Sequence, residues 1–310
     1  MIKTSADSRQ VASSPDPGPW ADIVLLGKPR ISTLVLVSTI LGFFLGSGGN
    51  FHWNTLIALM AGTILLSWGI HALNQYMERD TDALMERTRD RPLPSGRLQP
   101  KPVLIAGLIV TPISWGVFWW GTNGITTLIA IGVAILYVAI YTPLKRRSQL
   151  NTLVGAVPGA LPPVLGWAAG SGQLGVEALA MFLIMFVWQL PHFLPIAWLY
   201  RDDFRKANLA MITVDDPTGG STRRQLILYS FTLVAVSLFP SFIGMASFIY
   251  CIGALALGAA FFVCALAMAR HLSDDRARLV LRASVIYLPL LLGLLAYDVS
   301  TLHSTPIGHP

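Results

Sequence analysis

The sequence predicts an all-α integral membrane protein, a bundle of nine transmembrane helices. Of its 310 residues, 54% are hydrophobic and only 12% are charged, whereas soluble domains carry about 25% charged residues. The apolar residues fall into nine long runs, and the Lys and Arg residues fall into alternate connections between those runs. Composition, run length and charge distribution therefore all indicate the same fold class.

Each predicted span satisfies the length that a bilayer demands. A helix needs about 20 mostly apolar residues to cross the hydrocarbon core. Nine segments qualify: 31–47, 54–76, 102–121, 124–142, 152–170, 176–198, 225–244, 247–269 and 280–299. A segment from Trp20 to Arg30 is expected to lie along the interface, because it has a Trp anchor, an apolar middle and a basic end. We expect residues 1–19 to be a disordered cytoplasmic tail, 20–300 a single domain and 301–310 a short external tail.

The basic residues predict the orientation. All 22 Lys and Arg residues lie in the N-terminal tail, in the connections after the second, fourth, sixth and eighth spans, or at the edges of these. The positive-inside rule then places the N-terminus in the cytoplasm and the C-terminus outside. This asymmetry also explains the net charge of +6 without a nucleic-acid partner.

The most unusual stretch is 74–97, where acids and arginines directly follow the second span. Asn74, Glu78 and Asp82 recur at every fourth position, so on a continued helix their oxygen atoms lie along one stripe. Carboxylate and amide oxygens suit Mg²⁺, which is usually shared with substrate phosphates. The alternative is a helix that simply emerges into water, and that interpretation is preferred for Asp80, Glu86 and Asp90.

Basic residues cluster beside this stripe. The candidates for binding a diphosphate are Arg87, Arg91, Arg97, Lys145 and Arg146, because guanidinium and ammonium groups pair with phosphate oxygens. The alternative is that they obey the positive-inside rule or bind anionic lipid headgroups.

The sixth span and the connection after it form a second polar region. Asp202 and Asp203 are either a second acidic wall of a metal site or a solvated helix end. The span ends with His192 between Pro191 and Pro195, and the two prolines predict a bent helix beside a cavity. His192 is either a packing residue or a ligand. The fifth span is rich in small residues, which permit close helix approach or leave room for a bulky ligand.

These motifs together resemble the UbiA superfamily of intramembrane aromatic prenyltransferases. The first motif is the Asn74, Glu78 and Asp82 stripe followed by Arg87-Thr-x-x-Arg91-Pro-Leu-Pro-x-Gly-Arg97. Within the superfamily, further segments are similar to the branch that farnesylates heme: Lys28-Pro29-Arg30, Tyr141-Thr-Pro-Leu-Lys145-Arg146, Asn151, Gly166-Trp-Ala-Ala169 and Trp188-Gln-x-Pro-His192-Phe193. The resemblance covers about residues 25–225.

The resemblance implies nine helices around a central cavity, with Mg²⁺ as cofactor. It implies transfer of the farnesyl group of farnesyl diphosphate to the vinyl group of heme b, with addition of water, in the cell inner membrane and with the site facing the cytoplasm. The implied metal ligands are Asn74, Glu78 and Asp82, and these with Asp202 and Asp203 are the implied catalytic residues. The five basic residues named above would bind diphosphate, and His192, Trp188 and Phe193 would bind the acceptor.

Further aromatic residues and partners follow from the same resemblance. Trp68 and Tyr76, with Trp188 and Phe193, are candidates to shield an allylic cation. The lipid bilayer is the surrounding solvent, no nucleic acid is involved, and a heme-handling or downstream heme-modifying membrane protein is an expected partner.

Two rival functions differ from this one. The first is another aromatic acceptor, a quinone precursor or a chlorophyllide; Glu78, where many relatives have Asp, and the His192 segment oppose it. The second is a cation-coupled membrane transporter. Transporters usually hold ionisable groups near the midplane of the bilayer, whereas here the charges gather at one face.

Overall fold

The structure, a computed structural model, describes residues 18–216 and 218–304. Within these ranges the secondary structure is helical, without strands, and nine segments are long and apolar enough to cross a membrane, as predicted. They are α2 (Pro29–Gly46), α3 (Trp53–Asp82), α4 (Pro100–Gly121), α5 with η1 and α6 (Gly124–Ala134, Ile135–Tyr141, Thr142–Leu144), α7 with α8 (Asn151–Ala160, Pro162–Ser171), α9 (Val176–Leu199), α12 with α13 (Gly220–Ser237, Phe239–Phe242), α14 (Phe248–Arg270) and α15 (Asp274–Ser304).

The predicted tails lie mostly outside the described residues. Residues 1–17 and 305–310 are not described, so the expectation of a disordered N-terminal tail is not tested. At the other end, the ninth span is longer than predicted, because α15 begins at Asp274 and continues to Ser304. The domain boundaries from the sequence therefore stay a prediction.

The bend that the two prolines of the sixth span predict stays a prediction, but these prolines do not interrupt the helix. The sixth span, α9, is a continuous helix despite Pro191 and Pro195. The interruption falls instead in the fifth span, between α7 and α8, and the fourth span continues without a break as a π-helix at η1. Pro162 and Pro163 are adjacent and remove two successive backbone donors, whereas each proline of α9 removes a single one.

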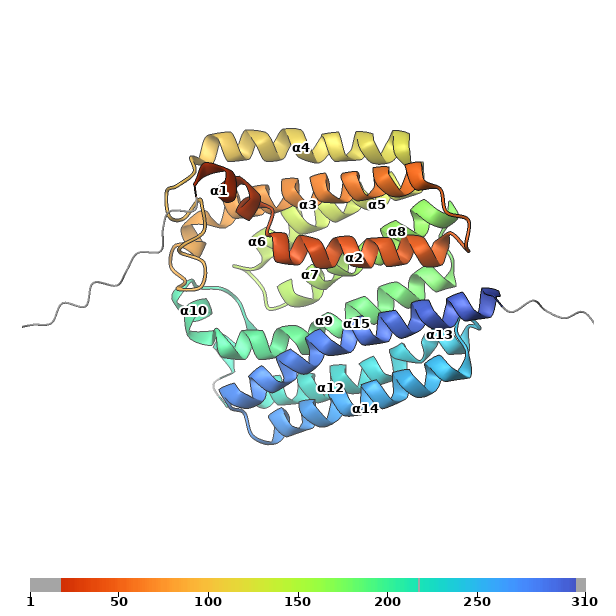
Figure 1. Cartoon of the computed structure of the whole chain (residues 1–310). Coiled ribbons are helices and arrows are strands. Elements are labelled where there is room, and N and C mark those ends of the chain that lie inside the picture. The colour runs from red at the N-terminus through yellow and green to blue at the C-terminus, as the bar shows by residue number, and fades with distance from the viewer. Residues whose placement is uncertain (1–17, 217, 305–310) are drawn as a thin grey trace, which may run out of the picture.

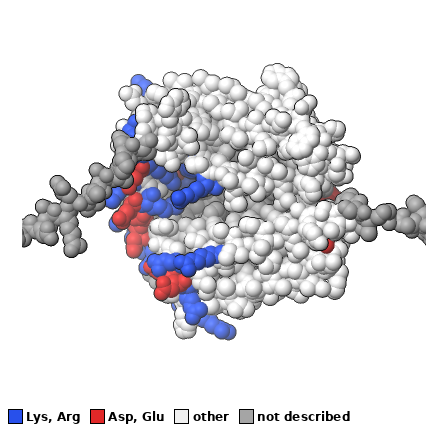
Figure 2. Space-filling view, in the orientation of Figure 1, with Lys and Arg blue, Asp and Glu red and all other residues white. Residues whose placement is uncertain are grey.

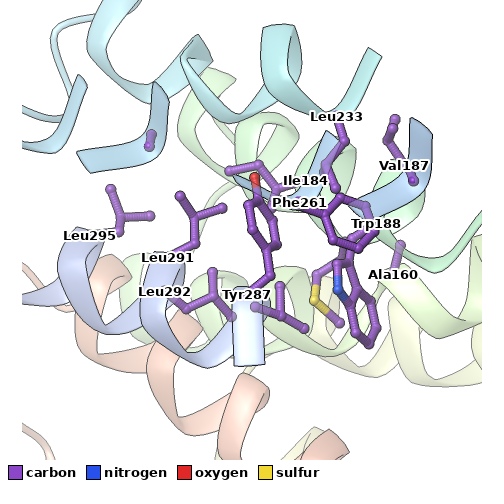
Figure 3. Packing of buried hydrophobic residues seen from close by; sticks show 14 of the residues in the cluster. Ala160, Ile184, Val187, Trp188, Leu233, Phe261, Tyr287, Leu291, Leu292 and Leu295 are labelled. Atoms are coloured by element: carbon purple, nitrogen blue, oxygen red, sulfur yellow. The ribbon is translucent and has the colours of Figure 1, made fainter. Parts of the chain in front are cut away.

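The two larger apolar clusters of the described residues lie within the bundle. One joins mainly α9, α12, α14 and α15, and includes Trp188, Phe261 and Tyr287 (Figure 3). The other joins α2, α3, α4, α5 and α8. Between α2 and α8 the backbones approach closely, since a Cβ at Gly166 would fall against the carbonyl oxygen of Thr39. The small residues of the fifth span thus permit close helix approach, one of the two predicted uses.

The connecting segments that carry charge gather at one end of the bundle. Figure 1 places α1 (Pro19–Leu26), the loop 83–99 and α10 (Arg201–Lys206) at this end. On the face seen in Figure 2, Lys, Arg, Asp and Glu side chains concentrate there, where the surface is hollowed. Trp20, the second residue of the short helix α1, is 81% exposed. The helix is held to α3 by a hydrogen bond from Trp68 Nε1 to the Ile23 carbonyl (2.8 Å).

Candidate active site

A cavity of about 530 Å³ runs from the charged end into the bundle. This volume is typical of a small-molecule site. The lining comes from α2, α3, η1, α7, α8 and α9, and from the loops at the charged end. Charged groups surround its mouth, and apolar side chains such as Leu34, Leu66, Val133 and Leu165 line the part farther along the helices. The cavity therefore has one polar end and one apolar end.

Two carboxylates of the predicted stripe line the mouth, and each has a cationic partner. Glu78 Oε1 lies 2.7 Å from Lys145 Nζ, with side chains 12% and 20% exposed respectively. Asp82, 1% exposed, accepts a hydrogen bond from Arg91 Nη1 at 2.6 Å. Burial alone would lower the pKa of Lys145, but Tyr141 and the Glu78 carboxylate raise it above its ordinary value. Lys145 is therefore a permanent cation.

Asn74 lies deeper, behind the cavity wall. It is fully buried, its side-chain oxygen accepts a hydrogen bond from Lys28 Nζ (2.7 Å), and its amide donates to Thr142 Oγ1 (3.0 Å). Among the described residues it is not part of the cavity lining. The structure therefore brings Glu78 and Asp82 to the cavity but turns the oxygen of Asn74 toward a lysine.

Lys28 is the residue that the sequence reasoning missed. The Lys28-Pro29-Arg30 segment was interpreted as the basic end of an interfacial segment and as part of the family resemblance, without a role in the site, yet Lys28 lines the cavity. Its backbone is left-handed, with φ of 49°, which turns the chain from α1 into α2. Burial, and then repulsion from Arg91, lowers its pKa to about 7. A charged residue directly before the proline that starts a span was the available signal.

Four of the five predicted diphosphate-binding residues line the cavity: Arg87, Arg91, Lys145 and Arg146. Arg146 bonds the Thr81 hydroxyl, and Arg87 lies over the ring of Tyr200 (4.9 Å to its centroid). Burial, and then the neighbouring Arg91, lowers the pKa of Arg87. With Lys28, five basic side chains face two carboxylates, an excess that favours a polyanionic ligand.

Arg97 lies elsewhere. Its Nε donates to both carboxylate oxygens of Asp22 (3.0 Å each), and Nη2 bonds the Asp90 carbonyl (3.0 Å). Asp22 belongs to α1 and is 3% exposed. We therefore assign Arg97 to holding α1 against the loop 83–99, rather than to the diphosphate.

The two aspartates of the second polar region are also outside the cavity lining. Asp203 accepts a bond from the backbone N–H of Arg87 (3.3 Å), and Asp202 pairs with Arg205 (3.1 Å) at the surface. From α10, the residue that lines the cavity is the apolar Phe204. It packs with Met85 of the loop 83–99 in one hydrophobic cluster. The two loops thus meet through packing, and Asp203 fixes the backbone that carries Arg87.

The predicted acceptor residues Trp188, His192 and Phe193 all line the cavity. The rings of Trp188 and His192 are stacked, with centroids 4.7 Å apart, and Phe193 lies 5.6 Å from His192. Tyr137 and Tyr141 of η1 also line the cavity.

Trp68 and Tyr76, the other predicted shielding residues, lie away from the cavity. Trp68 bonds α1, and Tyr76 lies under the guanidinium of Arg79 (4.7 Å). The aromatic residues of the cavity lining that the sequence analysis did not name are Tyr137 and Tyr141.

The donor set fits Mg²⁺ in one particular way. In the part of the chain that the structure describes, no group of three or more His, Cys, Asp or Glu side chains is placed to hold a metal ion. Glu78 and Asp82 nevertheless lie one helical turn apart and both line the cavity. Mg²⁺ characteristically takes one or two carboxylates together with substrate phosphates and water, so this pair fits a metal that arrives with its phosphate ligand.

Comparison with known proteins decides the family. The UbiA prenyltransferase family matches residues 35–291. The chain belongs to this family. It is similar to the protoheme IX farnesyltransferases of Solibacter usitatus, 42% identical over 286 residues, and Salinibacter ruber, 41% identical over 277 residues, in each case over 89% of this chain and 98% of the relative.

Solved structures share the fold. A digeranylgeranylglyceryl phosphate synthase superposes with a TM-score of 0.75 at 12% identity, covering 91% of this chain and 99% of the other. A UbiA homologue from Archaeoglobus fulgidus bound to GPP and Mg²⁺ gives 0.65 at 17% identity, covering 90% and 99%. The nine-helix arrangement is therefore the fold of this family.

Proposed function

We propose that this protein transfers the farnesyl group of farnesyl diphosphate to the vinyl group of heme b, with addition of water, and so makes heme o for terminal oxidase assembly. The observation that carries the proposal is the single cavity that joins a cationic mouth with two carboxylates to the His192 and Trp188 wall. Relatives at 41–42% identity are protoheme IX farnesyltransferases.

The mouth holds the diphosphate of the donor. Lys28, Arg87, Arg91, Lys145 and Arg146 line it, and their N–H groups are donors to phosphate oxygens. Glu78 and Asp82 would hold Mg²⁺, which binds with the prenyl diphosphate in the Archaeoglobus homologue and neutralises charge that develops on the leaving group when bound. The farnesyl chain then extends into the apolar part of the cavity.

The same cations favour departure of the diphosphate. As the bond between the farnesyl carbon and its oxygen breaks, negative charge builds on the leaving group next to Arg91 and Lys145. Fixed positive groups in a site shielded from water stabilise that charge strongly. Tyr137, Tyr141 and Phe193 line the path of the allylic cation, and each cation–π contact is worth about 0.5–2 kcal/mol.

The acceptor lies at the His192 wall. The terminal carbon of the heme vinyl group attacks the farnesyl carbon, a carbon–carbon bond forms, and diphosphate leaves. The positive charge moves to the vinyl carbon next to the porphyrin, water adds there and a proton is released. His192 contacts the heme, since neutral imidazole is a common ligand of heme iron, and Trp188 stacks behind it.

We infer that the charged end faces the cytoplasm of a cell whose inner membrane holds the protein. The support is the positive-inside rule, applied to the 22 Lys and Arg residues. The cavity mouth opens at that end, so farnesyl diphosphate enters from the cytoplasm. Heme is exchanged with a heme-handling or heme-modifying membrane protein.

An acceptor competition tests the function. The purified protein is incubated with farnesyl diphosphate, Mg²⁺ and either heme b or 4-hydroxybenzoate, and the farnesylated product is identified by mass spectrometry. The proposal predicts product from heme b alone. Product from 4-hydroxybenzoate, with none from heme b, would assign the chain to a quinone-type branch of the family. Absence of Mg²⁺-dependent diphosphate release with either acceptor would favour the transporter.

A further inference from the structure

We propose that Ser284 is the positioning residue that fixes the tautomer of His192, so that the Nε2 lone pair faces the cavity as a ligand for the iron of the porphyrin acceptor. Ser284 lies on α15, 92 positions along the chain from His192, and beyond the segment that carries the sequence motifs. The inference rests on the proposed function, because it needs heme as the acceptor.

The first step is the hydrogen bond between the two side chains. Ser284 Oγ lies 2.7 Å from His192 Nδ1. The same hydroxyl lies 2.7 Å from the carbonyl oxygen of Leu281, one turn earlier on α15. A carbonyl oxygen only accepts, so the single proton of the Ser284 hydroxyl goes to Leu281. Ser284 Oγ then accepts a hydrogen bond from Nδ1–H of His192.

The second step follows from the chemistry of imidazole. A neutral ring carries its proton on one nitrogen and a lone pair on the other. With the proton on Nδ1, the lone pair is on Nε2. His192 lines the cavity, and within the described residues no hydrogen bond engages its Nε2. The Nε2 lone pair of His192 is therefore available to an acceptor that lies against this side of the cavity.

The third step is rigidity. Ser284 is fully buried, and its backbone carbonyl accepts a hydrogen bond from Trp188 Nε1 at 2.9 Å. The Trp188 ring stacks on His192 at an interplanar angle of 19°. One residue of α15 thus holds both aromatic side chains of the acceptor wall. Metal-binding histidines characteristically give their second N–H to such a partner, which sets the ring orientation.

The test measures porphyrin binding, without turnover. Detergent-solubilised protein is titrated with heme b and, separately, with metal-free protoporphyrin IX, and the absorption spectrum reports affinity and iron ligation. Four proteins are compared: wild type, His192→Ala, Ser284→Ala and Ser230→Ala. Ser230 is the matched control, because it is equally buried and, among the described residues, its hydroxyl bonds the carbonyl of Leu226 on its own helix and no other group.

We expect Ser284→Ala to weaken heme b binding about 10-fold or more, the usual effect of losing a partner of a ligating histidine, and to shift the spectrum toward that of His192→Ala. Its affinity for protoporphyrin IX, which has no iron to ligate, should equal that of the wild type, and Ser230→Ala should match the wild type with both porphyrins.

Each other outcome overturns a different statement. Wild-type heme affinity and spectrum in Ser284→Ala, with both changed in His192→Ala, would refute the role of Ser284 alone. Equal loss of heme b and protoporphyrin IX in Ser284→Ala would show general damage to the pocket and also refute it. An unchanged heme spectrum in His192→Ala would refute the claim that His192 is a ligand of the heme iron. Absence of heme binding by the wild type would contradict the proposed function itself.

Discussion

Replacing Glu78 with Gln should have opposite effects on metal-free binding of farnesyl diphosphate and on Mg²⁺-dependent turnover. The substitution keeps the shape of the side chain and removes one negative charge. Lys145 Nζ, now 2.7 Å from Glu78 Oε1, loses its ionic partner and is free to bind diphosphate. We therefore expect farnesyl diphosphate to bind more tightly without metal, while Mg²⁺-dependent turnover falls.

The size of the first effect follows from the geometry. A phosphate oxygen bonded to Lys145 on the side away from Glu78 would lie about 5 Å from the carboxylate, two charge-assisted hydrogen bonds apart. Repulsion between unit charges at that distance is about 3 kcal/mol at an effective dielectric constant of about 20. Solvent at the mouth reduces this to about 1–2 kcal/mol, or about 5- to 30-fold in the dissociation constant.

The assay is calorimetric titration with farnesyl diphosphate in the presence of a chelator, followed by turnover with Mg²⁺. Turnover should fall about 100-fold or more, as it does when one electrostatic group is removed from a preorganised site. Glu86→Gln is the matched control, since Glu86 lies in the loop that directly follows α3, is 76% exposed and pairs weakly with Arg89 at 4.0 Å. Weaker metal-free binding, or undiminished turnover, in Glu78→Gln would refute the reasoning.

Three further substitutions test separate parts of the structure. The pKa of Lys28 is lowered to about 7, so its amine is charged at pH 6 and mostly neutral at pH 8. The KM for farnesyl diphosphate should therefore rise about 10-fold over that range. Lys28→Arg should flatten this rise, and an equal rise in the variant would contradict the role of Lys28. Arg97→Ala leaves the buried Asp22 carboxylate without its ion pair and should cost about 3–5 kcal/mol of unfolding free energy, with KM unchanged; a raised KM at full stability would return Arg97 to the diphosphate site. Gly166→Ala would push a Cβ against a backbone carbonyl of α2 and should cost about 1–3 kcal/mol, whereas Gly132→Ala, which faces open space, should not lower the thermal unfolding temperature.

The nine spans were predictable because run length and charge alternation are properties of the sequence itself. A missed or invented span would have broken the alternation of basic connections, so the two observations checked each other. The Glu78 and Asp82 stripe was predictable for a similar reason, since helical periodicity alone puts residues four apart on one face.

The contacts that decide individual roles join residues far apart in the chain. Lys28 donates a hydrogen bond to the side-chain oxygen of Asn74, 46 positions away, and Arg97 donates to Asp22, 75 positions away. Spacing within one segment contains no information about such partners. The same limit explains why Ser284 was not considered, although His192 was.

The prolines of the fifth and sixth spans differ in their effect on the helix. Pro191 and Pro195 lie within α9, which remains helical through both. The adjacent Pro162 and Pro163 interrupt the fifth span instead. Tandem removal of backbone donors outweighs two isolated losses, and that rule is readable from the sequence once it is applied.

The most direct test of the central claim, farnesyl transfer to heme b in this cavity, is the product formed in isotopically labelled water. Protein, farnesyl diphosphate, Mg²⁺ and heme b are incubated together, and the porphyrin product is analysed by mass spectrometry. The account predicts heme b carrying one farnesyl group and one hydroxyl group whose oxygen comes from the labelled water. Unmodified heme b beside released diphosphate and farnesol would contradict it.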